Sequence, residues 1–172
     1  AYIDFGGESA IPLTRKYDNL LVIQTFSKSR SLAGLRLGYA IGHKDLIEGL
    51  NRVKDSFNSY PIDSLAQTAA VSSIEDDSYF QQTCQKIVQT REQASEQLTR
   101  LRFKVLPSAA NFIFACHESR SAQELYSELK KAGVLVRYFN KPRIDNYLRI
   151  TIGTEQEMQK LIATLSKILQ QN

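Results

Sequence analysis

Short apolar runs alternate with longer segments of helical periodicity along this sequence, and this alternation constrains the fold more than any other feature. The run at 20–26 is rich in β-branched residues and bounded by polar ones, which predicts a strand buried on both faces. Further strands are predicted at 37–41, 110–116, 134–139 and 147–152. Strands that alternate with helices in this way predict an α/β fold.

Apolar residues recur at steps of three and four in the segments between these strands. This periodicity predicts a helix at 46–57, a second one ending near Ile74, and a long one at 78–101. A break at Pro61 separates the first two, and Asp63 can cap the second through its carboxylate.

Two capping boxes predict where the later helices begin. Ser121 with Glu124 precedes a predicted helix that stops at Gly133. Thr154 with Glu157 opens a predicted terminal helix with a continuous apolar stripe. The last third of the chain therefore continues the alternation of strand and helix.

The length of 172 residues suits one domain or two small lobes. A helix as long as the one at 78–101 commonly joins two lobes, so we expect a boundary between residues 1–85 and 86–172. Residues 1–5 are expected to form the end of a short strand. Because the sequence starts on an apolar stretch with Ala1 rather than Met, an internal fragment or a processed product is expected.

Several classes of protein are disfavoured by the sequence. No apolar run approaches the roughly 20 residues that span a bilayer, and no secretory signal pattern is visible. Cys84 and Cys116 fit neither a metal site nor a disulfide framework, so we expect two buried thiols in a reducing cytoplasm. His43 and His117 are far apart in sequence, and no metal site is predicted.

The net charge of +4 raises the question of a nucleic-acid partner. The basic residues are scattered and interleaved with acidic ones, which is typical of a solvated surface of mixed charge. We therefore expect neither nucleic acid nor a membrane as partner, and some of the excess charge can serve an anionic small molecule. A basic nucleic-acid binder remains the weakest alternative, and steep salt dependence of DNA binding would support it.

The segment 25–39 (TFSKSRSLAGLRLGY) carries the most chemical information. Lys28 follows a predicted strand in a loop rich in hydroxyl groups, and Arg36 comes shortly after it. Hydroxyls and loop amides bind phosphate oxygens, and arginine binds them in a bidentate manner. A lysine becomes a nucleophile when burial or a neighbouring cation lowers its pKa. A lone lysine in such a loop is more often a solvated surface residue, so it is the complete string that favours a phosphate site beside an amine nucleophile.

This string resembles the lysine motif of the fold-type I pyridoxal-phosphate aminotransferases. Its S-K followed by L-A-G-L-R-x-G is most similar to the histidinol-phosphate aminotransferase family. The opening AYIDF resembles the end of that family's D-E-A-Y-x-x-F motif, and LRITIGT near the end is similar to its carboxylate-binding strand. The resemblance covers essentially the whole chain. It implies the remainder of a large cofactor-binding domain for residues 1–85 and a small α/β carboxy-terminal domain for residues 86–172.

The resemblance also implies how the chain would hold pyridoxal 5'-phosphate. Lys28 would carry it as a Schiff base and move a proton between the substrate Cα and the cofactor. Tyr2 would donate a hydrogen bond to the cofactor's phenolic oxygen. Thr25 would pack by the ring or the phosphate, and Ser27 and Arg36 would bind the phosphate.

Two further arginines would bind the substrate if the resemblance holds. Arg149 would bind the α-carboxylate, and Arg137 would contact the substrate's own phosphate. As alternating strand residues, both would otherwise face solvent. Asn111 matches a recurrent family position, although a turn or strand-edge asparagine would look the same.

The leading hypothesis is a cytoplasmic, homodimeric histidinol-phosphate:2-oxoglutarate aminotransferase of histidine biosynthesis. An aromatic-amino-acid aminotransferase or a threonine-phosphate decarboxylase of the same subgroup is a close alternative. A non-catalytic effector or dimerisation module of a transcription regulator is an alternative of another class. The family's aspartate for the cofactor's pyridine nitrogen would lie two positions before Ala1, so the isolated chain is expected to be inactive.

Overall fold

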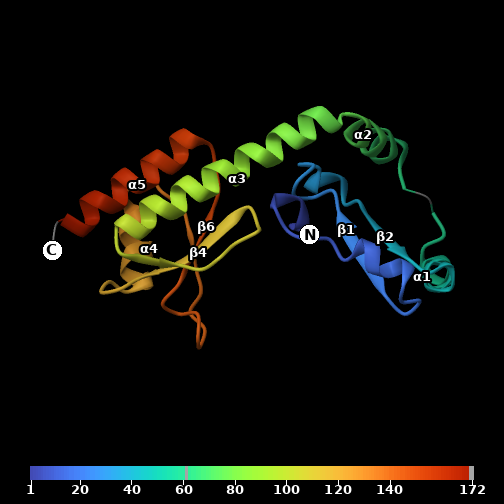
Figure 1. Cartoon of the computed structure of the whole chain (residues 1–172), viewed down its shortest axis with the longest axis horizontal. Helices are drawn as coiled ribbons and strands as arrows, with labels where there is room; N and C mark the ends of the chain where they lie inside the picture. Colours follow the sequence, from blue (N-terminus) through green and yellow to red (C-terminus); the bar gives the residue numbers. More distant parts are fainter. Residues whose placement is uncertain (61, 171–172) are drawn as a thin grey trace. The chain divides into compact units, whose positions relative to one another are not determined.

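The computed structural model describes residues 1–60 and 62–170, so the predicted break at Pro61 lies outside the described residues. The chain divides into two compact units, Ala1–Thr83 and Cys84–Asn172. Figure 1 shows the first unit in blue to green and the second in green to red. The assignment of these parts to a large cofactor-binding domain and a small domain stays a prediction.

The first unit contains a hairpin of two antiparallel strands, β1 (Leu21–Thr25) and β2 (Gly38–Gly42). Their register pairs Leu21 with Gly42 and Thr25 with Gly38. Three 3-10 helices and two α-helices accompany the hairpin: η1 (Ile3–Phe5), η2 (Ile11–Arg15), η3 (Ala33–Leu35), α1 (Lys44–Phe57) and α2 (Ser64–Glu75). The segment between β1 and β2 carries Lys28.

Both α-helices of this unit begin at side chains that cap them. Asp63 Oδ1 accepts a hydrogen bond from the Ala66 amide at 2.8 Å, which confirms the predicted cap of α2. His43 Nδ1 accepts one from the amide of Asp45 at the start of α1. The two predicted helices are confirmed, with ends displaced by one or two residues.

Two strand predictions for this unit are wrong. Residues 3–5 form η1 instead of a strand end, because Gly6, at φ 101°, turns the chain and Phe5 is completely buried. β1 is not buried on both faces, since Ile23 is 68% exposed. Within the described residues β1 pairs only with β2. An apolar run does not by itself specify whether other elements cover both of its faces.

α1 has an apolar face that no described residue buries. Leu50, Val53 and Phe57 lie at helical spacing and are 43%, 62% and 80% exposed. Among the described residues, thirteen of the fourteen exposed large hydrophobic side chains belong to the first unit. Its buried apolar residues are Phe5, Phe26, Leu37 and Ala66. The first unit thus has much apolar surface and little core.

The second unit is an antiparallel sheet of four strands in the order β3-β4-β6-β5, packed against helices (Figure 1). The strands are β3 (Phe103–Val105), β4 (Phe112–His117), β5 (Arg137–Tyr138) and β6 (Leu148–Thr151). The helices are α3 (Asp77–Arg100), of which the part from Cys84 belongs here, α4 (Ala122–Lys131) and α5 (Glu155–Gln170). The long helix and the predicted strands that became β4 and β6 are confirmed.

Alternation along β4 shows which face of the sheet the helices cover. Ile113 and His117 are buried, whereas every second residue of the strand is only half-buried. The buried side chains join a single hydrophobic core with residues of all three helices, including Leu98, Leu125 and Leu165. Since α3, α4 and α5 all contribute to this one core, no helix among the described residues of the second unit covers the opposite face of the sheet.

The predicted capping signals operate at both later helices. Ser121 Oγ accepts a hydrogen bond from the Glu124 amide at 3.2 Å. Thr154 Oγ1 accepts from the Glu157 amide at 3.3 Å, and Glu157 Oε2 accepts from the Thr154 amide at 2.7 Å. Hydrogen bonds that the amide and the hydroxyl of Thr154 donate to the carboxylate lower the pKa of Glu157. Gly133, at φ 72°, follows α4 as the predicted stop.

The strand predicted at 134–139 is wrong in its length, since only Arg137–Tyr138 forms a strand. The Val134 amide donates to Leu129 O at 2.9 Å and so closes the end of α4. A backbone amide used to close a helix cannot join a sheet ladder, and β5 therefore begins later than the apolar pattern suggests.

Candidate active site

Lys28 lies in a short loop that follows β1 and is closed by its own backbone. The Leu32 amide donates to Phe26 O at 2.9 Å, and the Ser31 amide donates to Lys28 O at 3.0 Å. Ser31 is in the left-handed region at φ 57°, which turns the chain sharply. Lys28 is exposed on this loop.

Tyr2, the predicted contact of the cofactor's phenolic oxygen, lies beside Lys28. Tyr2 immediately precedes η1 and is half-buried. Lys28 Nζ lies 5.8 Å from the centroid of the Tyr2 ring, a distance at which a cation is attracted to the ring. The fold of the first unit thus brings together two site residues that are far apart in the sequence.

Thr25 and Ser27 form a pair of hydroxyls at the start of the same loop. Thr25 Oγ1 donates to Ser27 Oγ at 2.9 Å, and the Ser27 amide donates to Thr25 Oγ1 at 3.1 Å. Both side chains are half-buried, so their geometry is set by the loop rather than by solvent. Hydroxyls fixed in this way can bind the oxygens of a phosphate group.

The hairpin register places Arg36 at the same end as Ser27. The Phe26 amide donates to Leu37 O at 3.1 Å, so the ladder continues one residue beyond the two strands. Arg36 follows η3 at φ 53°, and its Nη1 donates to Ala33 O at 2.8 Å. Its guanidinium is exposed and has further N–H groups for an anion. The predicted phosphate ligands therefore gather around the Lys28 loop.

Arg137 and Arg149 lie directly opposite each other on β5 and β6 of the second unit. Residues paired in this way point to the same face of a sheet. In the part of the chain that the structure describes, no carboxylate forms an ion pair with either guanidinium. Adjacent cations repel each other, and an anion bound between them would relieve that repulsion.

Arg149 is half-buried among aromatic rings rather than directed to solvent. Its guanidinium carbon lies 5.5 Å from the Phe112 ring centroid and 6.0 Å from that of Phe139. The Arg137 guanidinium carbon lies 5.5 Å from the same Phe139 ring. Arg149 Nε is buried and has no hydrogen-bond partner among the described residues. A buried donor without an acceptor costs free energy, which a ligand oxygen would recover.

Further aromatic rings line this uncovered sheet face. Phe114 pairs in register with Arg149 and stacks on Tyr147 with centroids 4.7 Å apart. Cys116 lies on the same face and is half-buried, which corrects the prediction that both cysteines are buried. A hydrogen bond with Cys116 raises the pKa of the Tyr147 hydroxyl. This face suits a small molecule that carries both an apolar ring and anionic groups.

Residues whose roles the sequence left open serve the fold. The Ile152 amide donates to Asn111 O at 2.9 Å, so Asn111 joins β4 to the end of β6 through its backbone. His117 is buried, its Nδ1 accepts from the Ser119 amide at 3.2 Å, and burial lowers its pKa. Among the described residues, no group of three or more His, Cys, Asp or Glu side chains could hold a metal ion.

Asp4 and Arg30, beside the candidate site, escaped prediction from the sequence, whereas Ser29 was expected among the hydroxyls of a phosphate site and bonds to Asp4 instead. Ser29 Oγ donates to Asp4 Oδ2 at 2.5 Å, and Arg30 Nη1 donates to Ser73 O. Only their proximity to Tyr2 and Lys28 in the sequence could have singled them out, because their partners are distant along the chain.

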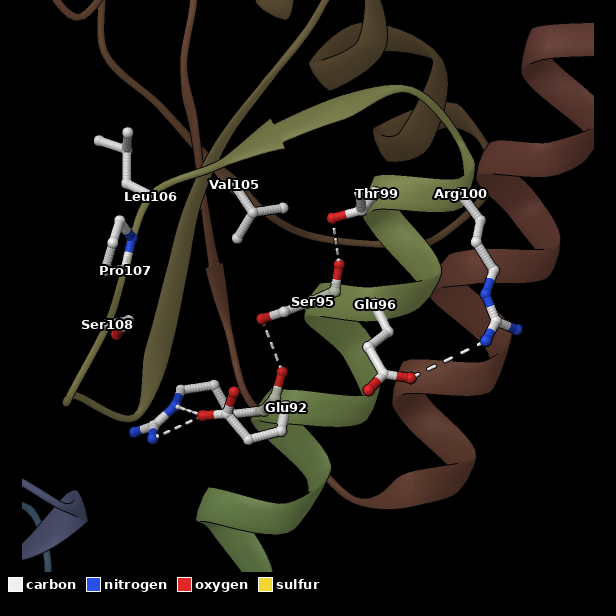
Figure 2. Close-up of a pocket in the computed structure, with 10 residues that line it drawn as sticks. Glu92, Ser95, Glu96, Thr99, Arg100, Val105, Leu106, Pro107 and Ser108 are labelled. Atoms are coloured by element: carbon white, nitrogen blue, oxygen red, sulfur yellow. Dashed lines mark hydrogen bonds and ion pairs between the residues drawn. The ribbon is translucent and has the colours of Figure 1, made fainter.

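A surface groove of about 490 Å³ lies elsewhere, within the second unit. Figure 2 shows Ser95 and Thr99 of α3 on one side of it, with Val105 and Leu106 on the other. Arg91 at its edge is buried and donates to Ala110 O at 3.0 Å. Ser95 Oγ is bonded to its own helix, and none of the predicted site residues lines this groove.

No helix among the described residues is both long and apolar enough to cross a membrane.

A family model described as aminotransferase class I and II matches residues 1–165. The chain belongs to this family. Members depend on pyridoxal phosphate, and one related structure contains it.

Curated relatives include a histidinol-phosphate aminotransferase 1 from Hydrogenovibrio crunogenus, 59% identical over 98% of this chain and 48% of the relative. A histidinol-phosphate aminotransferase from Clostridium beijerinckii is 58% identical over 100% of this chain and 48% of the relative. The chain thus spans about half the length of the curated relatives it matches.

Solved structures show the same fold. The histidinol-phosphate aminotransferase from Clostridium acetobutylicum has a TM-score of 0.89 at 24% identity, over 100% of this chain and 53% of that one. The enzyme of that name from Sinorhizobium meliloti, in complex with pyridoxal-5'-phosphate, has a TM-score of 0.84 at 22% identity, over 99% of this chain and 47% of that one. The predicted fold, part of a fold-type I aminotransferase, is therefore confirmed.

Proposed function

We propose that this chain supplies the cofactor lysine and the anion-binding arginines of a pyridoxal-phosphate-dependent histidinol-phosphate aminotransferase. The observation that carries the proposal is the pair Arg137 and Arg149, which face each other in register without an acidic partner among the described residues. Curated relatives of that name at 53–59% identity favour this substrate over those of other aminotransferases.

The residues of the Lys28 loop fit pyridoxal phosphate. The loop offers a primary amine that can react with the aldehyde and, beside it, a tyrosine that can donate to the phenolic oxygen. Its two linked hydroxyls and its exposed arginine can donate to the phosphate. When bound, the cofactor supplies an electron sink for the bond that breaks at the substrate Cα. Ser27, Thr25 and Arg36 would hold its phosphate, and the Tyr2 hydroxyl would orient its ring.

Lys28 has two tasks in this proposal. Its Nζ would hold the cofactor covalently and, once released by the substrate amine, would move a proton between the substrate Cα and the C4′ carbon of the cofactor. Its exposed position on a closed loop allows the amine to move between these tasks while the backbone stays in place.

Arg137 and Arg149 would bind the anionic groups of each substrate in turn. The amino donor carries a phosphate, and the proposed acceptor, 2-oxoglutarate, carries two carboxylates. Arginine matches both groups through its fork of N–H donors. Of these two arginines, Arg149 is the one whose Nε is buried without a hydrogen-bond partner among the described residues.

Borohydride reduction with pyridoxal phosphate, followed by peptide mass mapping, tests the central assignment. We expect a pyridoxyl adduct on Lys28 and none in Lys28→Arg. An adduct on any other lysine of the unchanged protein would contradict the proposal.

Substrate preference separates this proposal from an aromatic-amino-acid aminotransferase. Arg137→Ala in the complete enzyme should weaken phosphorylated substrates far more than phenylalanine, since only the former carry a phosphate. Equal losses for both would favour the aromatic alternative. Release of carbon dioxide from a phosphorylated amino acid would favour the decarboxylase.

We also propose that the complete protein, and not this chain alone, transaminates. The chain spans about half of its curated relatives, and the first unit leaves the apolar face of α1 open. A homodimer in the cytoplasm is part of this proposal, in keeping with two free cysteines. A transamination rate measured with the purified 172-residue chain would contradict it.

A further inference from the structure

The Lys28 loop is held on both sides by side chains that the proposed chemistry does not use. On one side, Ser29 is buried and its Oγ donates to Asp4 Oδ2 at 2.5 Å. Asp4 belongs to η1, which begins directly after Tyr2. A single charge-assisted hydrogen bond therefore joins the residue after Lys28 to the segment that carries Tyr2.

On the other side, Arg30 reaches the junction of α2 and α3. Its guanidinium carbon lies 3.9 Å from the centroid of the Phe80 ring, and its Nη1 donates to Ser73 O. Ser73 lies in the last turn of α2, where carbonyl groups lack partners within the helix and a cation is favourable. Arg30 thus stacks on the Phe80 ring, donates a hydrogen bond to Ser73 and places its positive charge at the carboxyl end of α2.

Space remains beside this contact. A cavity of about 260 Å³ lies between the loop and the two helices, lined by Ser29, Arg30, Ser72, Asp76 and Phe80 among others. Because this volume is not filled by side chains, apolar packing does little to fix the loop there. The contacts of Ser29 with Asp4 and of Arg30 with Ser73 and Phe80 therefore restrain the side of the loop that faces the cavity.

Asp4 and Arg30 also act on a common neighbour. Burial raises the pKa of the Tyr39 hydroxyl, the Asp4 carboxylate raises it further, and the Arg30 guanidinium opposes this. Tyr39 packs edge-on against Phe26 at the base of the loop, with centroids 5.6 Å apart. The Asp4 carboxylate and the Arg30 guanidinium thus lie near enough to the Tyr39 hydroxyl to act on it in opposite directions.

We propose that Asp4 and Arg30 are positioning residues that clamp the loop from opposite sides, so that Lys28 Nζ returns to one place beside Tyr2. This inference rests on the proposed role of Lys28 and deepens it. Neither residue touches the reacting atoms, and their effect reaches the amine through the backbone of residues 28–30. A closed backbone with an exposed amine is what a lysine needs in order to bind, release and rebind a cofactor at one position.

The first test needs no cofactor and uses the complete protein that contains this chain, because the first unit has little core of its own. Amide hydrogen exchange of residues 27–32 should become roughly tenfold faster in Arg30→Ala, since a stacked cation and a hydrogen bond from a charged donor are lost together. Asp4→Asn should have a smaller effect, because an amide oxygen can still accept from Ser29. Arg52→Ala is the matched control, because this exposed arginine of α1 pairs only with Glu48 in the described structure and should leave the loop unchanged. Unchanged exchange in Arg30→Ala would overturn the clamp.

The second test reports on Lys28 itself. With pyridoxal phosphate added, Arg30→Ala should slow formation of the Lys28 adduct severalfold and shift the pH at which the Schiff-base absorbance titrates. Arg30→Lys should restore part of both, because it keeps the charge and a donor for Ser73 but loses the planar stack. Identical rates and pH midpoints in Arg30→Ala and the unchanged chain would overturn the positioning role. If the unchanged chain forms its adduct on another lysine, the proposed function fails instead, while the exchange data still decide whether the clamp exists.

Discussion

Replacing Arg149 by Gln should remove anion binding without destabilising the second unit. A buried or half-buried arginine usually supports the fold, and its loss is usually costly. Arg149 differs because its Nε is buried without a partner and because Arg137 lies directly opposite it. Both features cost free energy in the absence of a ligand.

Three contributions set the expected size of the change. Removing a buried donor that lacks an acceptor recovers about 1–3 kcal/mol. Losing the contacts with the Phe112 and Phe139 rings, at 5.5 and 6.0 Å, costs about 1–2 kcal/mol. Relief of the repulsion from Arg137 returns a few tenths of a kcal/mol. Together these contributions range from about 1 kcal/mol of destabilisation to about 2 kcal/mol of stabilisation, and their central values predict that the free energy of unfolding rises by about 1 kcal/mol.

Arg91→Gln provides the matched comparison within the same unit. The Arg91 side chain is 6% exposed, and its Nη1 donates to Ala110 O at 3.0 Å. Removing it leaves a buried carbonyl without that donor and a cavity beside α3, which should cost about 2–4 kcal/mol. Both variants replace a poorly exposed arginine by glutamine. We expect only Arg91→Gln to lower the free energy of unfolding.

Urea unfolding, monitored by amide exchange in α4 and α5, would give the free energy of unfolding of each variant. A titration with phosphate would measure anion binding. We expect Arg149→Gln to keep or slightly raise the urea midpoint and to lose the stabilisation by phosphate. We expect Arg91→Gln to lower the midpoint and to keep the stabilisation by phosphate. If Arg149→Gln unfolds as readily as Arg91→Gln, Arg149 is a structural residue and the reasoning from its unpartnered Nε is refuted.

Three further predictions concern the stability of the second unit. Because burial places the pKa of His117 below its ordinary value, the unfolded chain binds more protons as pH falls below about 6.5. The free energy of unfolding should therefore decrease from that pH downwards, and urea midpoints of His117→Gln should lose this slope if the reasoning is right. Leu125→Ala, at a completely buried site of α4, should lower the free energy of unfolding by about 2–5 kcal/mol in urea titrations, and a loss below 1 kcal/mol would contradict the core assignment. Thr154→Ala should cost about 0.5–2 kcal/mol and speed amide exchange in the first turn of α5, whereas unchanged exchange there would show that the cap is dispensable.

The sequence predicted a helix or its cap correctly where the interactions that determine it lie between residues close together in the chain. The capping side chains of α2 and α5 bond to amides within the next three residues, so a short window contains the whole interaction. The apolar period of α3 likewise fixes its face and its extent. Burial of β1 and the length of β5 depend on distant elements, and the sequence predictions failed there.

In the candidate site, too, the sequence did not predict contacts between residues that are distant along the chain. Lys28 and Tyr2 were predicted through a motif and lie together in the structure. Asp4 and Arg30 act through residues far along the chain, and no spacing rule links them to Ser29 or Phe80. Arg149 alternates with apolar neighbours and would face solvent by period alone, but rings from β4 and the segment after β5 half-bury it.

The arginines of the chain fall into two groups that connect its net charge to its proposed ligands. The first group pairs with carboxylates in the described structure and consists of Arg52, Arg91, Arg100, Arg102 and Arg120. The second group forms no ion pair among the described residues and consists of Arg15, Arg30, Arg36, Arg137, Arg143 and Arg149. Three of this second group are the arginines that the family resemblance assigns to phosphate or carboxylate, and a fourth, Arg30, clamps the Lys28 loop. Positive charge left without a carboxylate partner is what the proposed anionic substrates and phosphorylated cofactor would require, so these arginines are a physical reason for part of the excess of +4.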